Sequence, residues 1–533
     1  MSIRECLEKA AVKNPDKVFL YFEDEQVTYK EFDARVNQRA NYFLQAGLEK
    51  GDTAAILLPN CPEFLYNWLA LAKIGAVMVP INTAYKGMEA QYVLNHSEAR
   101  LLVSNAELLK HTGIMSKQTE HLQEIVSVDT APNAEVGILA QLAARLPETL
   151  PPCEISKDDM ATILYTSGTT GPPKGCVLPQ EFYTVTGRQF TEFNAIDAND
   201  RVMTFLPLFH MAAETTTTMG TLIAEASMVL IDRFSATKFW DQVRKYRPTL
   251  FSYIGAVLSI LEDLPESSED RTHSIRRCFG GGATKELTEM AERRFNITVV
   301  EGYGSTEDGL VLSNYYKNGQ RRVGSIGKPA PGRAAKIVDD AGNELPPGQK
   351  GEIAISGGPM MLGYFKDPVA TAEVMKDGWF YTGDNGYMDE DGFVYFSERK
   401  KDIIRRAGEN ISSAEVENVI RSHPGVLDVA VVAVPDKIRK EEVKAYIMLR
   451  TGETEATVPP TEIVAHCSER LAYFKVPRYI EYRTTDFPRT LTNKILKHEL
   501  KKEKADLTEG CFDREKAKFN GIQCLEARNR SDH

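Results

Sequence analysis

The clearest chemical signal in the sequence is a candidate phosphate-binding loop. Residues 165–175 read YTSGTTGPPKG and follow the apolar run Ala161–Leu164, which is typical of a buried strand. Glycines let backbone N–H groups turn inward, while hydroxyls and a lysine supply donors for phosphate oxygens. Two prolines before the lysine and a glycine after it exclude a Walker A motif. The alternative is a mobile Gly/Ser/Thr loop, but the ordered spacing favours phosphate binding by Thr166, Ser167, Gly168, Thr169, Thr170, Gly171 and Lys174.

Three further motifs follow this loop along the chain. Residues 303–307 read YGSTE, residues 324–329 read GSIGKP and residues 379–384 read WFYTGD. Together with the loop, they resemble the adenylate-forming superfamily of acyl-CoA synthetases, luciferases and peptide-synthetase adenylation domains. The resemblance runs from about Asn14 to Leu500. It implies an enzyme that activates a carboxylic acid with ATP.

The YGSTE motif is expected to supply catalytic and metal-binding groups. Activation brings a carboxylate against a polyanion, so the site must neutralise charge and align both reactants. Glu307 offers a hard oxygen suited to Mg²⁺, and Thr306 can donate to the α-phosphate. A lone glutamate in a loop is usually a solvated charge. The adjacent Gly302 and Gly304 favour the catalytic interpretation.

Other positions are expected, by resemblance, to contact the nucleotide. A carboxylate accepts two hydrogen bonds and so suits the ribose diol at Asp384, with Arg399 reaching the same sugar. Gly280–Ala283 follows the strand-like Ile275–Phe279 and resembles the adenine-binding segment. The alternatives are an ordinary Thr-Gly-Asp turn and an ordinary Gly-rich strand end. The expected nucleotide and cofactor contacts outside the phosphate loop are Gly281, Gly282, Ala283, Glu301, Gly302, Tyr303, Gly304, Ser305, Asp384, Phe396, Arg399, Lys401 and Gly408.

The acid is expected to bind between two segments. LPLFH at residues 206–210 resembles a family segment that lines the acyl pocket, which assigns Phe209 to the substrate and His210 to catalysis. By family position, Tyr253 and Gly255 would form the opposite wall. A histidine after an apolar run is more often a packed core residue, but the order of the motifs favours the functional interpretation.

The C-terminal part carries the expected catalytic lysine. PRTLTNKI at residues 488–495 resembles a motif whose lysine approaches the carboxylate and the α-phosphate, which makes Lys494 the catalytic lysine. Asn493 stands where glycine is usual, and asparagine tolerates positive φ better than other residues. The alternative is a solvated lysine face, because Lys497 and Lys501 follow closely.

The charged run at residues 398–410 resembles the family's hinge and the loop after it. In that family the small domain swings after adenylation and admits the thiol acceptor, and Lys401 takes the hinge position here. Glu398 and Lys440 stand where glycine is common. The alternative is a plain charged linker.

These segments require an α/β scaffold to position them. A capping-box pattern at Thr28–Glu31 predicts a helix from Tyr29, and the chain then alternates strand and helix to Ser104, as in a doubly wound parallel sheet. Ala131–Pro152 loses periodicity and reads as a connecting surface segment. We expect an α/β fold with a large N-terminal domain of doubly wound sheets and a β-rich subdomain at 1–400. A small mobile α+β C-terminal domain at 401–507 and a flexible tail at 508–533 would follow.

Composition restricts the functional classes. The 533 residues, 42% hydrophobic and 26% charged, suffice for several folded cores. The net charge of −11 and the lack of a long basic run argue against nucleic acid as a partner. Eight scattered cysteines without a CxxC pair suggest free thiols in a reducing compartment. The N-terminus lacks an apolar signal region, and Phe64–Pro80 is too short to span a bilayer, so we expect a cytoplasmic protein without a transmembrane segment.

The expected activity is that of an ATP-dependent, AMP-forming acyl-CoA ligase. A carboxylate and ATP would give acyl-adenylate and pyrophosphate, and coenzyme A would then give acyl-CoA and AMP, with Mg²⁺ as the metal. Residues 235–247, 436–439 and 474–477 look closest to the bacterial crotonobetaine/carnitine–CoA ligases, so crotonobetaine or carnitine is the expected acid.

Three alternatives remain open. The acid could instead be a short- to medium-chain fatty acid or an aromatic acid, and another thiol could be the acceptor. A catalytically silent acyl- or nucleotide-binding protein is the third. The sequence leaves the oligomeric state open, with a dimer as one option.

Overall fold

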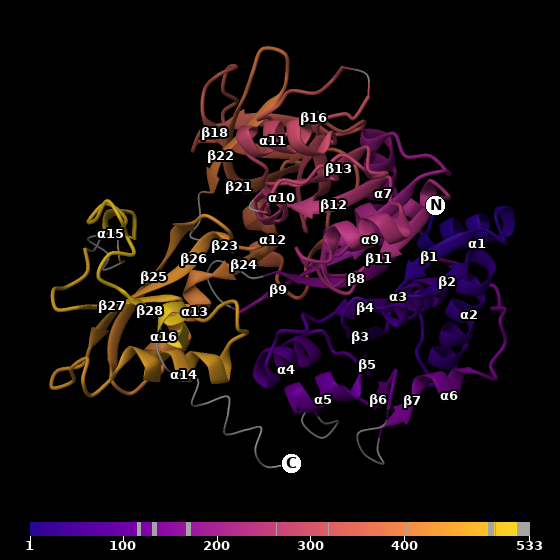
Figure 1. Ribbon diagram of the computed structural model, residues 1–533. Coiled ribbons are helices and arrows are strands. Elements are labelled where there is room, and N and C mark those ends of the chain that lie inside the picture. Colours follow the sequence, from indigo (N-terminus) through magenta and orange to yellow (C-terminus); the bar gives the residue numbers. More distant parts are fainter. Residues whose placement is uncertain are drawn as a thin grey trace. The chain divides into compact units, whose positions relative to one another are not determined.

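The computed structural model describes residues 1–114, 119–130, 136–166, 172–262, 264–317, 319–399, 403–488, 495 and 497–519. These residues form two compact units. The first comprises the described residues within 1–83, 90–166 and 174–400, and the second those within 84–89, 172–173 and 401–533. Each unit has its own sheets (Figure 1).

Two mixed sheets form most of the first unit. In each, a parallel centre carries antiparallel strands at an edge, as in doubly wound folds. The nine-stranded sheet has the order β16-β15-β14-β13-β12-β10-β11-β1-β2, and its strands are β1 (Val18–Phe22), β2 (Glu25–Thr28), β10 (Arg201–Thr204), β11 (Ser227–Leu230), β12 (Leu250–Ile254), β13 (Arg277–Gly281), β14 (Thr298–Ser305), β15 (Gly309–Ser313) and β16 (Lys328–Pro329). The eight-stranded sheet has the order β19-β9-β8-β4-β3-β5-β6-β7, and its strands are β3 (Thr53–Leu57), β4 (Val77–Pro80), β5 (Leu101–Ser104), β6 (Glu124–Ser127), β7 (Gly137–Ile138), β8 (Met160–Thr166), β9 (Lys174–Pro179) and β19 (Gly363–Tyr364).

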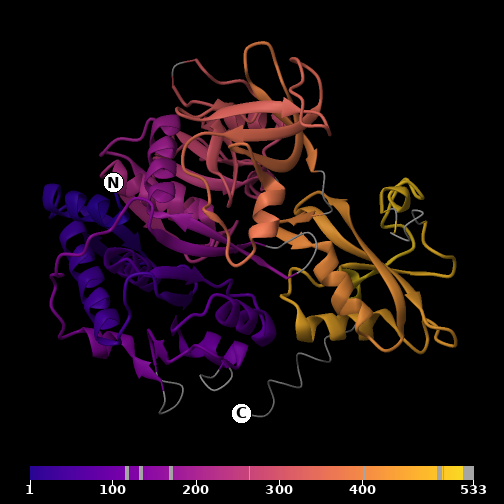
Figure 2. The same ribbon diagram turned by 180° about the vertical axis from the view of Figure 1, so that it is seen from behind.

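An antiparallel sheet completes the first unit and can be followed in Figure 2. Its strands are β17 (Ala334–Val338), β18 (Gly351–Ser356), β20 (Met375–Lys376), β21 (Trp379–Met388) and β22 (Val394–Arg399). These residues match the β-rich subdomain that the sequence predicts before position 400.

Helices accompany the two mixed sheets. The helix α3 (Pro62–Ile74) is buried from Phe64 to Ile74, with Trp68 fully buried and the buried Lys73 paired with Asp33 at 2.7 Å. The helices are α1 (Ile3–Lys13), α2 (Tyr29–Gln45), α3 (Pro62–Ile74), α4 (Gly87–His96), α5 (Ala106–Thr112), α6 (Leu139–Ala143), α7 (Gln180–Asn194), the π-helix η2 (Ala212–Met219), α8 (Gly220–Ile223), α9 (Phe239–Tyr246), α10 (Gly255–Glu262), α11 (Lys285–Phe295) and α12 (Pro368–Val374). The first residues of α4 belong to the second unit and the rest to the first.

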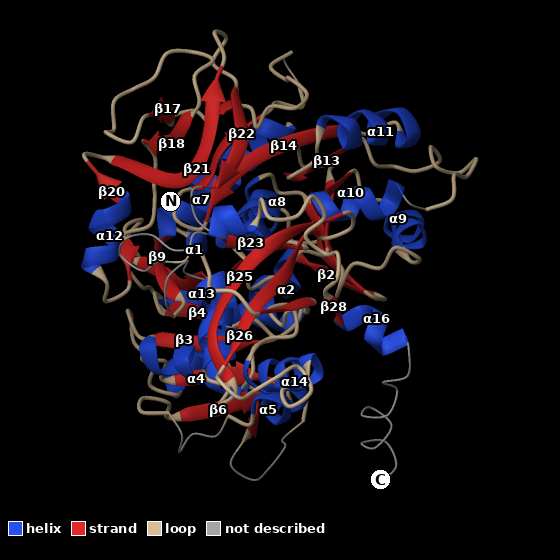
Figure 3. Ribbon diagram, turned by 90° about the vertical axis from the view of Figure 1, so that its left-hand side faces the viewer, coloured by secondary structure: helices blue, strands red, loops and turns tan. Residues whose placement is uncertain are grey.

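The second unit is an α+β sheet structure. Its longest strands, β25 (Val426–Asp436) and β26 (Lys440–Leu449), pair along their length and appear as adjacent long arrows in Figure 3. The other elements are β23 (Ile403–Arg406), β24 (Glu409–Ser412), β27 (Tyr479–Arg483), β28 (Phe512–Asp513), α13 (Ser413–Arg421), α14 (Pro460–Arg470), α15 (Lys497–Leu500) and α16 (Arg514–Phe519).

The structure corrects two expectations about surface segments. The tail expected over 508–533 is folded in part, because β28 pairs with β27 and the Asp513 carboxylate forms an ion pair with Arg478 at 3.2 Å. Residues 520–533 lie outside the described part. The segment Ala131–Pro152 contributes β7 and α6, with Leu139 fully buried, so it is more than a surface connection.

Two sequence predictions about local structure, the helix cap at Thr28 and the strand–helix alternation after it, are confirmed. Thr28 caps α2 by accepting from the Glu31 N–H, and the Glu31 carboxylate in turn accepts from the Thr28 N–H. The predicted alternation from Thr53 to Ser104 is β3-α3-β4-α4-β5. Within the described residues, no helix combines the length and apolar character that a bilayer crossing needs.

Candidate active site

The flanks of the predicted phosphate loop are an antiparallel strand pair. Thr166 ends β8 and lies opposite Lys174, which begins β9. The Thr166 hydroxyl is 3.5 Å from the Lys174 carbonyl oxygen. The pair therefore closes the loop at its base. Ser167, Gly168, Thr169, Thr170 and Gly171 lie outside the described residues.

Glu307 is held at three points in the turn after β14. Its N–H donates to the Ser305 hydroxyl at 3.2 Å, and its carbonyl oxygen accepts from the Met361 N–H at 2.7 Å. Its carboxylate oxygen Oε1 accepts from the Tyr364 hydroxyl at 2.9 Å. Burial and the Glu307 charge raise the pKa of Tyr364 far above its usual range, so this tyrosine remains a donor. Thr306 lies in the same turn.

Tyr364 also contacts the lysine of the phosphate loop. The Lys174 ammonium nitrogen lies 5.1 Å from the centroid of the Tyr364 ring. The sequence analysis did not select Tyr364, because nothing in the local pattern GYF signals a contact with positions 174 and 307. The pairing of β19 with β9 brings Tyr364 to Lys174, and the Met361–Glu307 backbone hydrogen bond brings it to Glu307.

The two residues predicted to bind ribose are neighbours. Asp384 on β21 lies opposite Arg399 on β22 in the strand register, and Phe396 lies opposite Gly386. The Asp384 Oδ2 atom accepts from the Tyr303 hydroxyl at 2.8 Å. Burial, together with the Asp384 charge, raises the pKa of Tyr303.

The predicted adenine segment converges on Glu301. Gly281 ends β13, and the N–H groups of Gly282 and Ala283 donate to the Glu301 carboxylate at 3.1 and 2.8 Å. Gly282 has φ +90°, a left-handed conformation that favours glycine. The Tyr253 hydroxyl also donates to Glu301. Gly302 and Gly304 belong to β14, and a Cβ on Gly304 would lie 1.7 Å from the Gly309 carbonyl oxygen, so that position requires glycine.

The loop carrying the predicted acyl-pocket residues is fixed by an asparagine. The Asn60 Oδ1 atom accepts from the Leu208 N–H at 2.8 Å, and its Nδ2 donates to the Leu206 carbonyl at 3.0 Å. The Phe209 and His210 rings follow with their centroids 4.9 Å apart. Asn60 is far away in sequence, and its role is not visible from spacing alone.

The opposite wall of the predicted acyl pocket combines a strand end and a helix start. Tyr253, the residue before the end of β12, is only 1% exposed. Gly255 is the first residue of α10. The structure therefore places both predicted residues at a strand-to-helix transition.

A buried carboxylate lies in the π-helix that follows His210. Glu214 is fully buried, and its Oε2 accepts from the Tyr183 hydroxyl at 2.6 Å. The Thr162 hydroxyl oxygen lies 2.8 Å from that of Tyr183. Burial raises the pKa of Glu214 to about 8. The Thr218 hydroxyl donates to the Ala213 carbonyl five residues earlier, which matches the wide turn of a π-helix.

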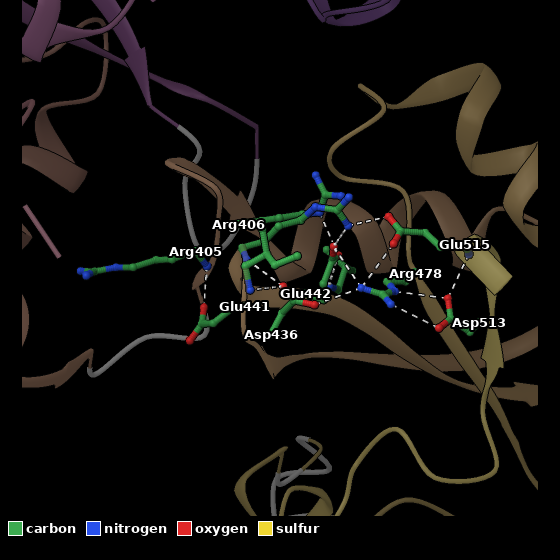
Figure 4. A network of polar contacts seen from close by, with 11 residues as sticks. Arg405, Arg406, Asp436, Glu441, Glu442, Arg478, Asp513 and Glu515 are labelled. Atoms are coloured by element: carbon green, nitrogen blue, oxygen red, sulfur yellow. Dashed lines mark hydrogen bonds and ion pairs between the residues drawn. The ribbon is translucent and has the colours of Figure 1, made fainter. Parts of the chain in front are cut away.

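The second unit holds a network of charged side chains near the predicted hinge region (Figure 4). Arg406 of β23 pairs with the fully buried Glu442 at 2.8 Å, and Arg439 contacts the same carboxylate. Arg478 pairs with Asp513 at 3.2 Å. Asp436 and Glu515 also belong to the network, and the nearby Glu441 carboxylate accepts from the Arg405 backbone N–H.

The remaining predicted C-terminal residues are placed only in part. Gly408 lies in the turn between β23 and β24 with φ +93°. Lys440 has φ +70°, a left-handed conformation at the position where the resemblance expects glycine. Lys401, Lys494 and Asn493 lie outside the described residues.

Two family matches identify the class of protein to which these features belong. Residues 7–365 match the AMP-binding enzyme family, and residues 415–494 match the C-terminal domain of AMP-binding enzymes. The chain therefore belongs to the AMP-binding enzyme family.

Individual relatives narrow the class. A crotonobetaine/carnitine–CoA ligase of Escherichia coli O45:K1 (strain S88 / ExPEC) is 38% identical over 485 residues, which cover 89% of this chain and 93% of that protein. Among solved structures, an o-succinylbenzoate CoA synthetase double mutant from Bacillus subtilis is 30% identical with a TM-score of 0.82, covering 94% of this chain and 98% of its own. An amide bond synthetase from Marinactinospora thermotolerans is 25% identical with a TM-score of 0.85, covering 94% and 99%. The predicted fold class and the predicted class of enzyme, an AMP-forming acyl-CoA ligase, are confirmed.

Proposed function

We propose that this enzyme ligates a betaine-type acid, with crotonobetaine or carnitine as the first candidate, to coenzyme A. One observation of the structure carries the site assignment. The strand β14 and the turn after it present Glu301, Tyr303 and Glu307, and each is hydrogen-bonded to a residue from another strand or strand end. The predicted adenine, ribose and metal contacts thus share one scaffold.

In the first half-reaction, a carboxylate oxygen of the acid attacks the α-phosphorus of ATP. The new bond gives the acyl-adenylate, and the bond to pyrophosphate breaks. Lys174 and the phosphate loop would stabilise the charge that develops on the departing pyrophosphate. Thr306 would donate to the α-phosphate. Lys494 would bridge the carboxylate and the α-phosphate.

Magnesium fits the groups present around Glu307. The described residues contain no cluster of three or more His, Cys, Asp or Glu side chains suited to a metal. Mg²⁺ commonly binds through one or two carboxylates, substrate phosphates and water, so the single carboxylate of Glu307 would hold it together with ATP. The metal would neutralise phosphate charge when bound.

In the second half-reaction, the coenzyme A thiolate attacks the acyl carbonyl, and AMP leaves. We assign to Lys401 the hinge about which the small domain rotates between the two half-reactions. Residues 1–400 would form the nucleotide- and acyl-binding domain, and residues 401–507 the domain that rotates. Gly408 would line the thiol's approach. The seven cysteines in the described part of the chain are free thiols, which supports a cytoplasmic location.

The choice of acid rests on the relatives and on two kinds of side chain. Aromatic faces attract quaternary ammonium groups, and Phe209, Tyr253 and Tyr303 are the candidates. The Glu301 carboxylate of β14 accepts a hydrogen bond from the Tyr253 hydroxyl of β12 and so places negative charge beside that side chain. Both features suit a cationic acid.

A half-reaction assay tests the ligase. Pyrophosphate release is followed with ATP and acid alone, and thioester formation is followed after coenzyme A is added. Adenylation without thioester would favour another acceptor, and an amine should then be tested because an amide bond synthetase shares the fold. Nucleotide binding without pyrophosphate release would favour a silent binding protein.

A matched pair of acids tests the substrate. Crotonobetaine is compared with its carbon isostere, in which carbon replaces the quaternary nitrogen and only the carboxylate charge remains. We expect kcat/KM to be higher for crotonobetaine by roughly 3-fold to 30-fold, as one cation–π contact of about 0.5 to 2 kcal/mol allows. A preference for the isostere would contradict the betaine assignment and leave the ligase assignment intact.

A further inference from the structure

Tyr364 lies between the two charged groups that ATP would engage in the first unit. Its hydroxyl donates to Glu307 Oε1 at 2.9 Å, and its ring centroid lies 5.1 Å from the Lys174 ammonium. We infer that Tyr364 is a positioning residue that sets the Glu307 carboxylate and the Lys174 ammonium relative to each other. This inference rests on the proposed function, because it gives both groups a role toward metal-bound ATP.

The Tyr364 backbone is pinned on two sides. Its N–H donates to the Thr371 hydroxyl at 2.9 Å. The flanking residues bind β9, since the Leu362 N–H donates to the Val177 carbonyl at 2.8 Å and the Phe365 N–H to the Gly175 carbonyl at 2.7 Å. The strand that anchors Tyr364 is thus the strand that begins with Lys174. The position of the ring is set by the same backbone that sets Lys174.

The Glu307 backbone is pinned from the Tyr364 segment as well. Its carbonyl oxygen accepts from the Met361 N–H, three residues before Tyr364. With both main chains fixed, the remaining freedom of Glu307 lies in its side-chain torsions. The Tyr364 hydroxyl restricts these torsions by fixing Oε1.

A tyrosine at position 364 can orient the Glu307 carboxylate and contact the Lys174 ammonium without neutralising either charge. A lysine or arginine in its place would neutralise Glu307 and repel Lys174, whereas a neutral hydroxyl leaves the carboxylate its full charge. The ring face gives the ammonium a weak, reversible contact that ATP phosphates can replace. Residues that orient a metal-binding group commonly matter 10-fold to 100-fold for metal affinity.

Equilibrium binding of ATP separates the two contacts. ATP is titrated calorimetrically into the full chain without any carboxylic acid, once with MgCl₂ and once with a chelator, so that no turnover occurs. Tyr364→Phe keeps the ring. We therefore expect its affinity for ATP in the presence of the chelator to match that of the unmodified chain. The gain in affinity from magnesium should fall by about 10-fold or more. In Tyr364→Leu, affinity should fall in the chelator condition too, because the ring contact to Lys174 is lost.

Tyr395→Phe is the matched control. It removes another hydroxyl of the first unit that binds a carboxylate, Asp389 at 3.2 Å, and should leave both affinities unchanged. An unchanged magnesium gain in Tyr364→Phe would overturn the inference and leave the proposed function standing. No magnesium gain in the unmodified chain would overturn both the metal assignment and the inference. The phenylalanine variant decides the matter even if Tyr364→Leu fails to fold.

Discussion

Carboxylates are held differently in the two units. In the candidate site of the first unit, Glu301, Glu307 and Asp384 each accept a hydrogen bond from a tyrosine hydroxyl. In the network of the second unit, Glu442 and Asp513 are paired with arginines. A tyrosine fixes a carboxylate and leaves its charge in place, whereas an arginine neutralises it.

The difference separates carboxylates positioned for a ligand from those that hold the fold. The first unit contains the second kind too, away from the site. Its buried Asp200 pairs with the buried Arg277 at 2.9 Å, and Asp270 pairs with Arg294 at 2.6 Å. An arginine partner therefore indicates a carboxylate that holds the fold, whereas a tyrosine partner also occurs outside the candidate site, at Glu214 and Asp389. Four changes test this comparison.

The largest effect is expected on stability, at Glu442. Glu442→Ala leaves Arg406 and Arg439 without a buried counter-charge, and loss of one partner of a buried pair costs about 3 to 5 kcal/mol. Urea unfolding measures the change. Glu515→Ala is the control, because that carboxylate is 35% exposed and should cost far less. Equal small losses in both variants would contradict a structural role for the network.

Lys174 offers the matching test in the candidate site. Its ammonium lies over an aromatic ring, so Lys174→Ala leaves no buried carboxylate uncompensated and should alter stability little. Pyrophosphate release at saturating ATP should slow by about 100-fold to 1000-fold, as for loss of one transition-state donor. Lys245→Ala, at an exposed lysine paired with Asp24, is the control. Unchanged pyrophosphate release would mean that Lys174 is structural.

A Glu214 variant tests whether burial keeps a carboxyl group protonated even though a tyrosine hydroxyl donates to it. Its pKa is raised by burial to about 8 from an ordinary value of 4.5, so the folded state holds the proton that the unfolded state releases. Its stabilisation is present below the unfolded pKa and is lost as pH rises through the folded pKa. Relative to Glu214→Gln, the wild type should lose about 2 kcal/mol of unfolding free energy between pH 6 and pH 8. Urea unfolding at both pH values measures this, and parallel pH curves would show that Glu214 is ionised when buried.

The smallest effect is expected at Tyr303. Tyr303→Phe removes the donor to Asp384 and leaves the carboxylate charge, so the proposed contact of Asp384 with ribose should weaken without being lost. We expect KM for ATP to rise about 10-fold, in line with a hydrogen bond to a charged group, while kcat changes much less. Steady-state kinetics at varied ATP measure the split. A fall in kcat alone would place Tyr303 in the chemical step instead.

The sequence predicts features that depend on short-range pattern. The capping box at Thr28 and the strand–helix alternation of the first sheet need only local signals, and the structure has both. Motif order also predicted neighbours far apart in sequence, since Gly282 and Ala283 reach Glu301. The proposed chemical roles of these residues remain predictions.

Other features depend on contacts that no spacing encodes. Tyr364 and Asn60 act through partners more than 50 residues away, and each is an ordinary residue in its own segment. In the sequence Glu442 looks like a solvated residue of a strand. In the structure its side chain is fully buried and contacts arginines. The folded segment at 512–519 has no apolar periodicity, and it is anchored by the pairing of β28 with β27 and by ion pairs such as Asp513–Arg478.

The π-helix η2 has a consequence for how the gene can change. It contains four consecutive threonines, Thr215–Thr218, and a π-turn holds one residue more than an α-turn needs. Loss of any one threonine codon would yield the same shortened protein, which could close into an ordinary α-helix. Such a deletion would turn the helical residues before the gap, Glu214 among them, relative to those after it. The run of threonines is therefore a place where a single in-frame deletion, at the cost of one buried threonine, can re-aim a buried carboxylate.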